Sequence, residues 1–280
     1  MKALTFLARR FVAGETIDEA LTQVKRLNED GIKVTLDNLG EDCETPAQAE
    51  AATKEYLTML GRIASAGVDC NVSLKLTQFG LNLDRSLARD NLAKVAELAH
   101  SFGNFVRIDM EGSAYTQTTL DLFYELFPRY PNLGVVIQAY LRRSEKDIEE
   151  CVRRGVRVRL CKGAYKEPPS LAFRTKDEVN QNYDKLARLL VKAPIPAFAT
   201  HDDQRIEAAI KAAEAAGLSK EKYEIQMLYG LRAKTWRDLV KAGHTVRVYM
   251  PYGTHWFPYF SRRVRERKEN LMFVVKNLFR

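Results

Sequence analysis

The amino-acid sequence predicts an α/β fold in which eight parallel strands close into a (β/α)8 barrel. Short β-branched or apolar runs recur eight times, and amphipathic helical patterns lie between them. Strands that alternate with helices form a parallel sheet, and eight such units close naturally into a barrel. An open, doubly wound sheet is the alternative. The expected strands lie within 33–40, 71–80, 105–112, 133–140, 156–165, 195–202, 223–230 and 245–253.

Three of the expected helices have clear start and stop signals in the sequence. Thr45-Pro46 opens a helix that closes at Gly67, and Ser144 with Asp147 opens one that closes at Gly155. A third runs through "DDQRIEAAIKAAEAAG" and ends at Gly217, with Asp202 or Asp203 as its N-cap. Polar capping residues, an early proline and a terminal glycine are typical of helix ends.

Length and composition favour one domain spanning residues 1–280. A chain of 280 residues suits a single barrel, and its 46% apolar and 29% charged residues are typical of a folded protein. Apolar runs are too short to span a bilayer, and we find no signal peptide, so we expect a cytoplasmic protein. The four cysteines are scattered without a C-x-x-C pair, which favours reduced thiols.

Polar residues cluster where the expected strands end. In barrels of this class the active site lies at these carboxyl ends and in the loops that follow them. Buried charges need partners, so a polar and mostly anionic ligand is expected there, in agreement with the net charge of +8. The residues at these positions are Asp37, Asn38, Lys75, Asp109, Glu111, Gln138, Arg159, Lys162, Thr200, His201, Asp202, Gln226 and Tyr249.

Several of these residues have more than one interpretation. Lys75 could form a Schiff base, anchor a carboxylate or make a structural ion pair with Asp109, and the ion pair is the commonest. Lys162-Gly163 could bind phosphate through backbone N–H groups or form an ordinary turn. The His201-Asp202 pair could bind a metal, but too few histidines accompany it, and we expect none. The sequence contains neither G-x-G-x-x-G nor G-x-x-x-x-G-K-[ST], so barrel loops would have to hold any dinucleotide.

The segment after the last expected strand is rich in aromatic residues and arginine. On a helix, Glu266 lies four residues after Arg262 and three after Arg263, so one carboxylate can orient both guanidinium groups. An exposed basic helix is the simpler interpretation of these charges. The preceding aromatic residues favour instead a small ligand that packs against rings while an arginine binds its carboxylate. These are Tyr249, Tyr252, Trp256 and Tyr259.

Six motifs in this order resemble the proline dehydrogenase family of flavoenzymes: "SLKLTQFG", "RIDMEG", "RLCKGAY", "FATHD", "QMLYG" and "YMPYG…YFSRRVRER". The resemblance covers nearly the whole chain and includes the pattern Y-x-x-R-R-x-x-E. It is similar in length to the short monofunctional bacterial form. It implies a distorted (β/α)8 barrel whose last helix lies over the barrel mouth.

The resemblance also implies the reaction and its substrate site. The family oxidises L-proline to Δ1-pyrroline-5-carboxylate by hydride transfer from proline C5 to flavin N5, and passes the electrons to a membrane quinone. Asp109 would shape the site and pair with Lys75, and Arg159 would lie near flavin N5. The substrate residues implied are Lys75, Leu228, Tyr249, Tyr259, Arg262, Arg263 and Glu266. The FAD contacts implied are Met110, Gln138, Arg159, Lys162, Gly163, Ala164, Thr200, His201 and Gln226.

One departure from the family pattern is a short N-terminal region before the first expected strand. In the family this region is longer and helical, and its shortness here would affect oligomer assembly or membrane contact. The basic, amphipathic end over 264–280 permits peripheral contact with the inner face of a membrane, although this pattern is more typical of a packed helix. A lysine-dependent aldolase using Lys75 or Lys162 is an alternative enzyme. A nucleic-acid-binding protein is disfavoured, because acidic residues interrupt the basic ones and no binding module is present.

Overall fold

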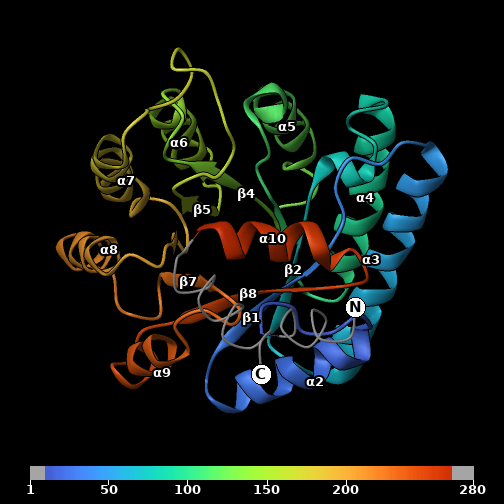
Figure 1. Ribbon diagram of the computed structural model, residues 1–280, viewed down its shortest axis with the longest axis horizontal. Helices are drawn as coiled ribbons and strands as arrows, with labels where there is room; N and C mark the ends of the chain where they lie inside the picture. Colours follow the sequence, from blue (N-terminus) through green and yellow to red (C-terminus); the bar gives the residue numbers. More distant parts are fainter. Residues whose placement is uncertain (1–9, 267–280) are drawn as a thin grey trace.

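The computed structural model describes residues 10–266, in which eight parallel strands alternate with helices (Figure 1). The strands pair in chain order, and β8 pairs with β1, so the sheet closes into a barrel and the open-sheet alternative is excluded. Each observed strand lies within its predicted run except β2, which begins one residue before its run. The strands are β1 (Lys33–Asn38), β2 (Cys70–Leu74), β3 (Val106–Ile108), β4 (Leu133–Gln138), β5 (Val158–Cys161), β6 (Ala197–Ala199), β7 (Glu224–Leu228) and β8 (Val246–Tyr252).

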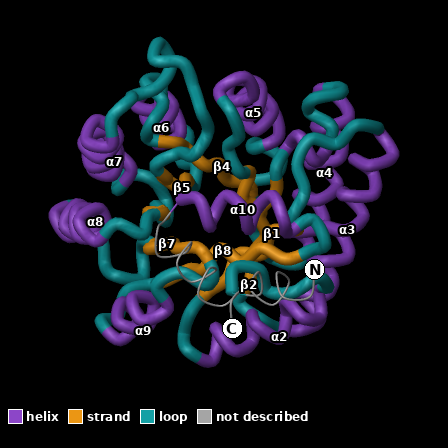
Figure 2. The backbone as a smooth tube through the Cα atoms, viewed as in Figure 1, coloured by secondary structure: helices purple, strands orange, loops and turns teal. Residues whose placement is uncertain are grey.

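The strands form an inner ring with helices around it (Figure 2). The helices are α2 (Ile17–Glu29), α3 (Pro46–Ala66), α4 (Arg85–Ser101), α5 (Ser113–Leu126), α6 (Ser144–Arg153), α7 (Lys176–Leu190), α8 (Asp203–Ala215), α9 (Ala233–Lys241) and α10 (Trp256–Glu266). A short 3-10 helix, η1 (Leu76–Phe79), follows β2 where the sequence predicted a longer strand. None of the helices within residues 10–266 is long and apolar enough to cross a bilayer.

Strand β8 shows how apolar and polar side chains are divided between the two faces of the sheet. In β8, Val246 and Val248 belong to the large apolar core, in which residues of the strands pack with residues of the surrounding helices. Arg247 and Tyr249, which alternate with them, bond to Glu224 of β7 and to Asp109, which directly follows β3. Because β3 and β8 are not neighbours, this second bond must cross the barrel interior. The period-two pattern of a strand therefore separates an apolar outer layer from a polar centre.

Helix caps follow the sequence signals at two of the three expected helices. Thr45 forms a capping box with Gln48 at the start of α3, and Gly67 closes it in a left-handed conformation. Asp202 caps α8 by accepting a bond from the Gln204 N–H. The expected cap at Ser144 is wrong, because that buried side chain donates to the carbonyl of Gln138 instead, 2.5 Å away.

Helix α10 lies across the barrel mouth, as expected (Figure 1). The segment at residues 10–14 supports it from below. Phe11 is fully buried, and its ring lies 6.0 Å from that of Phe260 in α10. Backbone bonds join Ala13 to Pro251 and Gly14 to Gly253, so this segment is tied to the end of β8. The position of α10 therefore depends on contacts from both ends of the described chain.

We predict that Gly230→Ala destabilises the fold more than Gly217→Ala. Both glycines have positive φ, +75° and +73°, so each alanine carries a backbone cost of about 1–2 kcal/mol. At Gly230 the new Cβ would also lie 1.7 Å from the carbonyl oxygen of Arg10, whereas Gly217 has open space. Overpacking should add about 1–3 kcal/mol. Urea unfolding of both variants measures the difference, and equal losses would show that the contact with Arg10 is unimportant.

Candidate active site

A cavity of ≈ 1340 Å³ opens at the carboxyl ends of the strands, beneath α10. It brings together most of the residues to which the sequence assigned a function. The site residues predicted from the sequence that line it are Lys75, Asp109, Met110, Gln138, Arg159, Lys162, Gly163, Ala164, Thr200, His201, Gln226, Leu228, Tyr249 and Tyr259.

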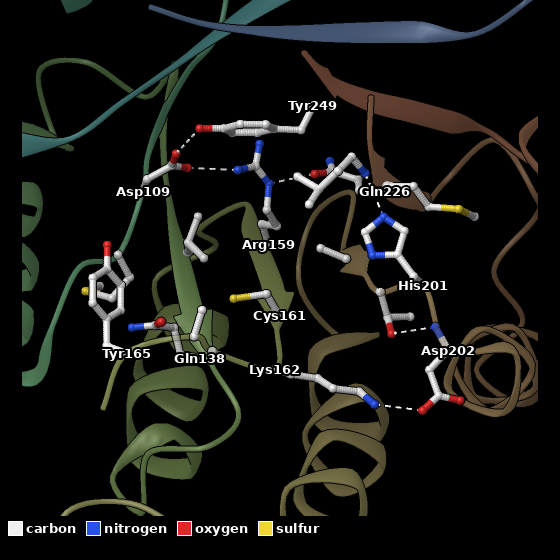
Figure 3. Close-up of a pocket in the computed structure, with 18 of the residues that line it drawn as sticks. Asp109, Gln138, Arg159, Cys161, Lys162, Tyr165, His201, Asp202, Gln226 and Tyr249 are labelled. Atoms are coloured by element: carbon white, nitrogen blue, oxygen red, sulfur yellow. Dashed lines mark hydrogen bonds and ion pairs between the residues drawn. The ribbon is translucent and has the colours of Figure 1, made fainter. Parts of the chain in front are cut away.

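Asp109, directly after β3, is the centre of a buried polar cluster (Figure 3). One carboxylate oxygen accepts from Ser73 Oγ at 2.5 Å and from the Arg159 guanidinium at 2.8 Å. The other accepts from the Tyr249 hydroxyl at 2.8 Å. Burial raises the pKa of Tyr249 well above its usual range, so its phenol stays protonated and donates. Both oxygens of Asp109 therefore already have donors, which makes it a residue that organises the site.

Lys75 lies between two carboxylates, as the structural ion-pair interpretation predicted. Its ammonium lies 3.5 Å from Asp37 and 3.8 Å from Asp109. Burial alone would lower the pKa of Lys75, but these two carboxylates outweigh burial and raise it above its ordinary value. A Schiff-base lysine must lose its proton to attack a carbonyl. The surroundings of Lys75 therefore oppose the aldolase alternative at this residue.

Arg159 lies between Asp109 and Gln226, with Tyr249 against its guanidinium (Figure 3). Its Nε donates to Gln226 Oε1 at 2.6 Å, and its central carbon lies 5.3 Å from the centre of the Tyr249 ring. The side chain is only 7% exposed. Hydrogen bonds and a cation–π contact thus hold this buried cation in one orientation at the floor of the cavity.

The opposite part of the cavity lies at the start of α7 and α8. Lys162 donates to Asp202 at 2.7 Å and to Asn180 at 2.6 Å. The Nε2 of His201 accepts from the backbone N–H of Leu228, which holds the loop after β6 against β7. Thr200 accepts from the backbone N–H of Asp202. These contacts fix the polar groups of this region before any ligand binds.

The turn at Gly163 is required by packing. Its φ is +99°, and a Cβ there would lie 2.1 Å from the ring of Tyr140. The loop beyond it is joined to α5 by Glu167, which accepts from the backbone N–H of Ser113 at 2.6 Å and from its hydroxyl. The packing of this loop therefore explains the glycine without a ligand, in agreement with the ordinary-turn alternative.

The expected aromatic group divides between two environments. Tyr249 and Tyr259 line the cavity. Tyr252 packs in the large core, and Trp256 packs against a smaller cluster that contains Phe11 and Phe260, so neither lines the cavity. The expectation that all four rings face a ligand is wrong for these two. The backbones of Arg262, Arg263 and Glu266 belong to α10, and their side chains lie outside the described part of the structure.

Sequence reasoning missed several residues that line or support the site. Ser73 shares a strand face with Lys75 at a spacing of two residues, so the alternation of β2 could have revealed it. Arg232 also lines the cavity, and its backbone is left-handed, with a φ of +58°. No local sequence pattern predicted either feature. Arg232 donates to the carbonyl of His201 and pairs with Asp203. Within residues 10–266, no group of three or more His, Cys, Asp or Glu side chains could hold a metal ion.

A family model described as "Proline dehydrogenase" matches residues 20–276. The chain belongs to this family. Proline dehydrogenase 2 of Bacillus subtilis strain 168 is 38% identical over 272 residues, which are 97% of this chain and 90% of that protein. The proline dehydrogenase of Deinococcus radiodurans is 36% identical, with 98% of this chain and 90% of that protein covered.

A solved structure supports the same relationship. It is proline utilization A from Bdellovibrio bacteriovorus inactivated by N-propargylglycine, and it matches with a TM-score of 0.86 and 29% identity. The match covers 93% of this chain but only 32% of that protein, so the chain spans about a third of its length. The family membership predicted from the six motifs is thus confirmed.

We predict that Glu111→Gln reduces the pH dependence of stability between about pH 5 and pH 8. Burial raises the pKa of Glu111 from its ordinary 4.5 to about 7, despite bonds from Thr77. The folded protein therefore holds a proton that the unfolded chain has lost in this range. Neutral Glu111 is therefore tolerated in the folded state below pH 4.5. As pH rises through about 7 the group must ionise while buried, and the free energy of unfolding falls by up to about 3 kcal/mol.

Glutamine mimics the neutral acid, so the variant should lose less stability than the unmodified protein between the two pH values. Urea unfolding at each pH measures the difference. An unchanged pH dependence would show that Glu111 ionises normally in the folded protein.

Proposed function

We propose that this protein is a proline dehydrogenase that uses FAD to oxidise L-proline to Δ1-pyrroline-5-carboxylate, the first step of proline catabolism. The observation that carries the proposal is the clustering of Lys75, Asp109, Arg159 and Tyr249 at one side of a large cavity, in a chain of this family. The closed barrel also supports a single catalytic domain over residues 1–280.

The cavity fits a dinucleotide together with a small substrate. Its volume of ≈ 1340 Å³ exceeds the roughly 300–1,000 Å³ usual for a drug-sized ligand, and proline is far smaller. The first residues of α7 and α8 line it, so two helix N-termini face it and favour negative charge. Lys162, Lys166 and Lys176 line the same part of the cavity, together with Asp177, Asp202 and Asp203, and Lys162 pairs with Asp202. The N–H groups at the two helix starts and the ammonium groups of Lys166 and Lys176 are the donors proposed for the two phosphates of FAD.

The residues proposed to hold FAD are those that the family resemblance implies. Lys162, Gly163, Ala164, Thr200 and His201 would hold its polar parts near α7 and α8. Met110, Gln138, Arg159 and Gln226 would contact the remainder, toward the barrel centre. Each of these side chains or backbone segments lines the same cavity. Bound FAD would supply the acceptor for the hydride that leaves proline C5.

The proline carboxylate would bind at the end of the site where Lys75 lies. Lys75 provides a buried ammonium there, and Arg262 and Arg263, oriented by Glu266, would complete the clamp from α10. Tyr249, Tyr259 and Leu228 would pack around the pyrrolidine ring and exclude water. Holding the ring in one orientation brings C5 to the acceptor, and such positioning supplies much of the rate enhancement.

Charge stabilisation is the second contribution of the protein. The buried guanidinium of Arg159 would stabilise negative charge that develops beside it during the transfer, because a fixed charge acts strongly in a site that excludes water. The amine of proline must lose its proton for the imine to form. Asp109 is not assigned as the base, because Ser73, Arg159 and Tyr249 already donate to it.

The proposal includes a membrane quinone as electron acceptor and a cytoplasmic location. The net charge of +8 favours contact with the anionic inner face of a membrane. We propose no binding to nucleic acid.

The proposal predicts that purified protein loaded with FAD reduces a soluble quinone analogue only when L-proline is present. The product should react with o-aminobenzaldehyde, which traps the cyclic imine. No product from proline, with FAD bound, would overturn the proposed substrate.

In the same assay, Arg262→Ala and Arg263→Ala should each raise the KM for proline by about 100-fold, because a charged hydrogen bond to the carboxylate is lost. Lys146→Ala, on the outer helix α6, is the matched control that removes a cation away from the cavity. An unchanged KM in both arginine variants would remove them from the substrate site.

A further inference from the structure

A hydrogen-bonded chain continues from Arg159 toward the opposite end of the barrel. Gln226 accepts from Arg159 Nε through its Oε1, and its Nε2 donates to Glu224 Oε2 at 2.7 Å. Glu224 begins β7, two residues before Gln226 and on the same face of the strand. It is 4% exposed and does not line the cavity, so it lies below the proposed site and would not touch substrate or cofactor.

The chemistry of the two ends determines how the Gln226 amide is oriented. An arginine side chain only donates hydrogen bonds, and an ionised carboxylate only accepts them. An amide between them can satisfy both neighbours in one orientation alone, with its oxygen toward Arg159 and its nitrogen toward Glu224. Reversing the amide would place a donor against the Arg159 Nε, which is costly at a buried position.

Glu224 is itself fixed from below by Arg247 of β8. The Arg247 Nε lies 3.1 and 3.0 Å from the two carboxylate oxygens, and one terminal nitrogen donates to Oε1 at 3.0 Å. The other terminal nitrogen donates to the carbonyl of Val34 in β1 at 2.7 Å. Burial alone would raise the pKa of Glu224, but Arg247 lowers it to about 2, so the carboxylate stays ionised and remains an acceptor.

We propose that Glu224 is a positioning residue, which sets the orientation of Gln226 and thereby holds Arg159 in place for catalysis. This inference rests on the proposed function, in which Arg159 contacts the cofactor. The ion pair between Glu224 and Arg247 would then join β7 to β8 and also help to orient a residue of the active site.

The substitution Glu224→Gln tests this role with almost no change in volume. Glutamine keeps one acceptor oxygen, and the positive charge of Arg247 competes for it. With that oxygen held by Arg247, the NH2 group of the new glutamine faces the NH2 group of Gln226. The amide of Gln226 should therefore reverse, which turns its NH2 group toward Arg159. The Arg159 Nε then loses its acceptor, while the bond from Arg159 to Asp109 and every residue of the cavity remain unchanged.

The matched control is Arg247→Gln, which breaks the same ion pair from the other side. The carboxyl group of Glu224 remains and Arg247 no longer competes for it, and whether ionised or protonated it keeps an oxygen that can accept from the Gln226 NH2 group. A purely structural role predicts that the two variants behave alike. A positioning role predicts similar losses in thermal midpoint but different effects on the bound flavin.

We expect Glu224→Gln to slow anaerobic reduction of the bound flavin by proline by about 10- to 100-fold, the range expected when a reacting group is misplaced. The concentration of proline for half-maximal reduction should change less than about threefold, because the carboxylate clamp is intact. The flavin midpoint potential should become more negative, because a displaced cation stabilises the reduced form less. Arg247→Gln should keep the reduction rate within about threefold of the unmodified protein.

The inference is overturned if Glu224→Gln leaves both rate and potential unchanged, or if Arg247→Gln slows reduction equally. Should Glu224→Gln fail to fold, Glu224→Asp is used instead, because it keeps the charge beside Arg247 but shortens the reach to Gln226. Slower flavin reduction and a more negative midpoint potential are again expected, and no change in either would overturn the inference. The midpoint potential is measured without proline. A shifted potential in a protein that proline cannot reduce would therefore refute the proposed substrate and support the positioning role.

Discussion

The ion pair between Arg159 and Asp109 is the contact on which the centre of this barrel depends. Barrel interiors of this class are usually filled by branched apolar side chains. Here Asp109, which follows β3, and charged groups from β5, β7 and β8 meet inside, and ion pairs offset the high cost of burying them. Arg159 joins Asp109 on one side to Gln226 on the other. Loss of either partner would leave one side of the buried guanidinium without its acceptor.

This polar centre changes what holds the fold together. The apolar core lies between the strands and the surrounding helices, where Val248 and Val72 pack with helical residues such as Tyr56. The interior contributes orientation and charge instead of apolar burial. Its groups are bonded before a ligand arrives, so little reorganisation would accompany binding, which is the arrangement that favours charge stabilisation. Helix α10 then closes the mouth, supported by Phe11.

The sequence predicted the fold well because short β-branched or apolar runs recur eight times between amphipathic helical patterns. The limits of those runs were less accurate. Residues after Leu74 were expected to continue a strand but form η1, since nothing local distinguishes a buried turn from a buried strand. Lys75, Asp109 and Arg159 were found because strand ends carry function in barrels. Glu224 was missed because it lies at the start of its strand, and Glu167 because its partner is 54 residues away.

The central claim is that the charged cavity binds FAD and delivers L-proline to it. The most direct test is the visible spectrum of the purified protein, loaded with FAD, before and after anaerobic addition of L-proline. The account predicts flavin absorption bands that bleach when proline is added. A protein that does not bind FAD, or bound flavin whose bands persist with excess proline, would contradict it.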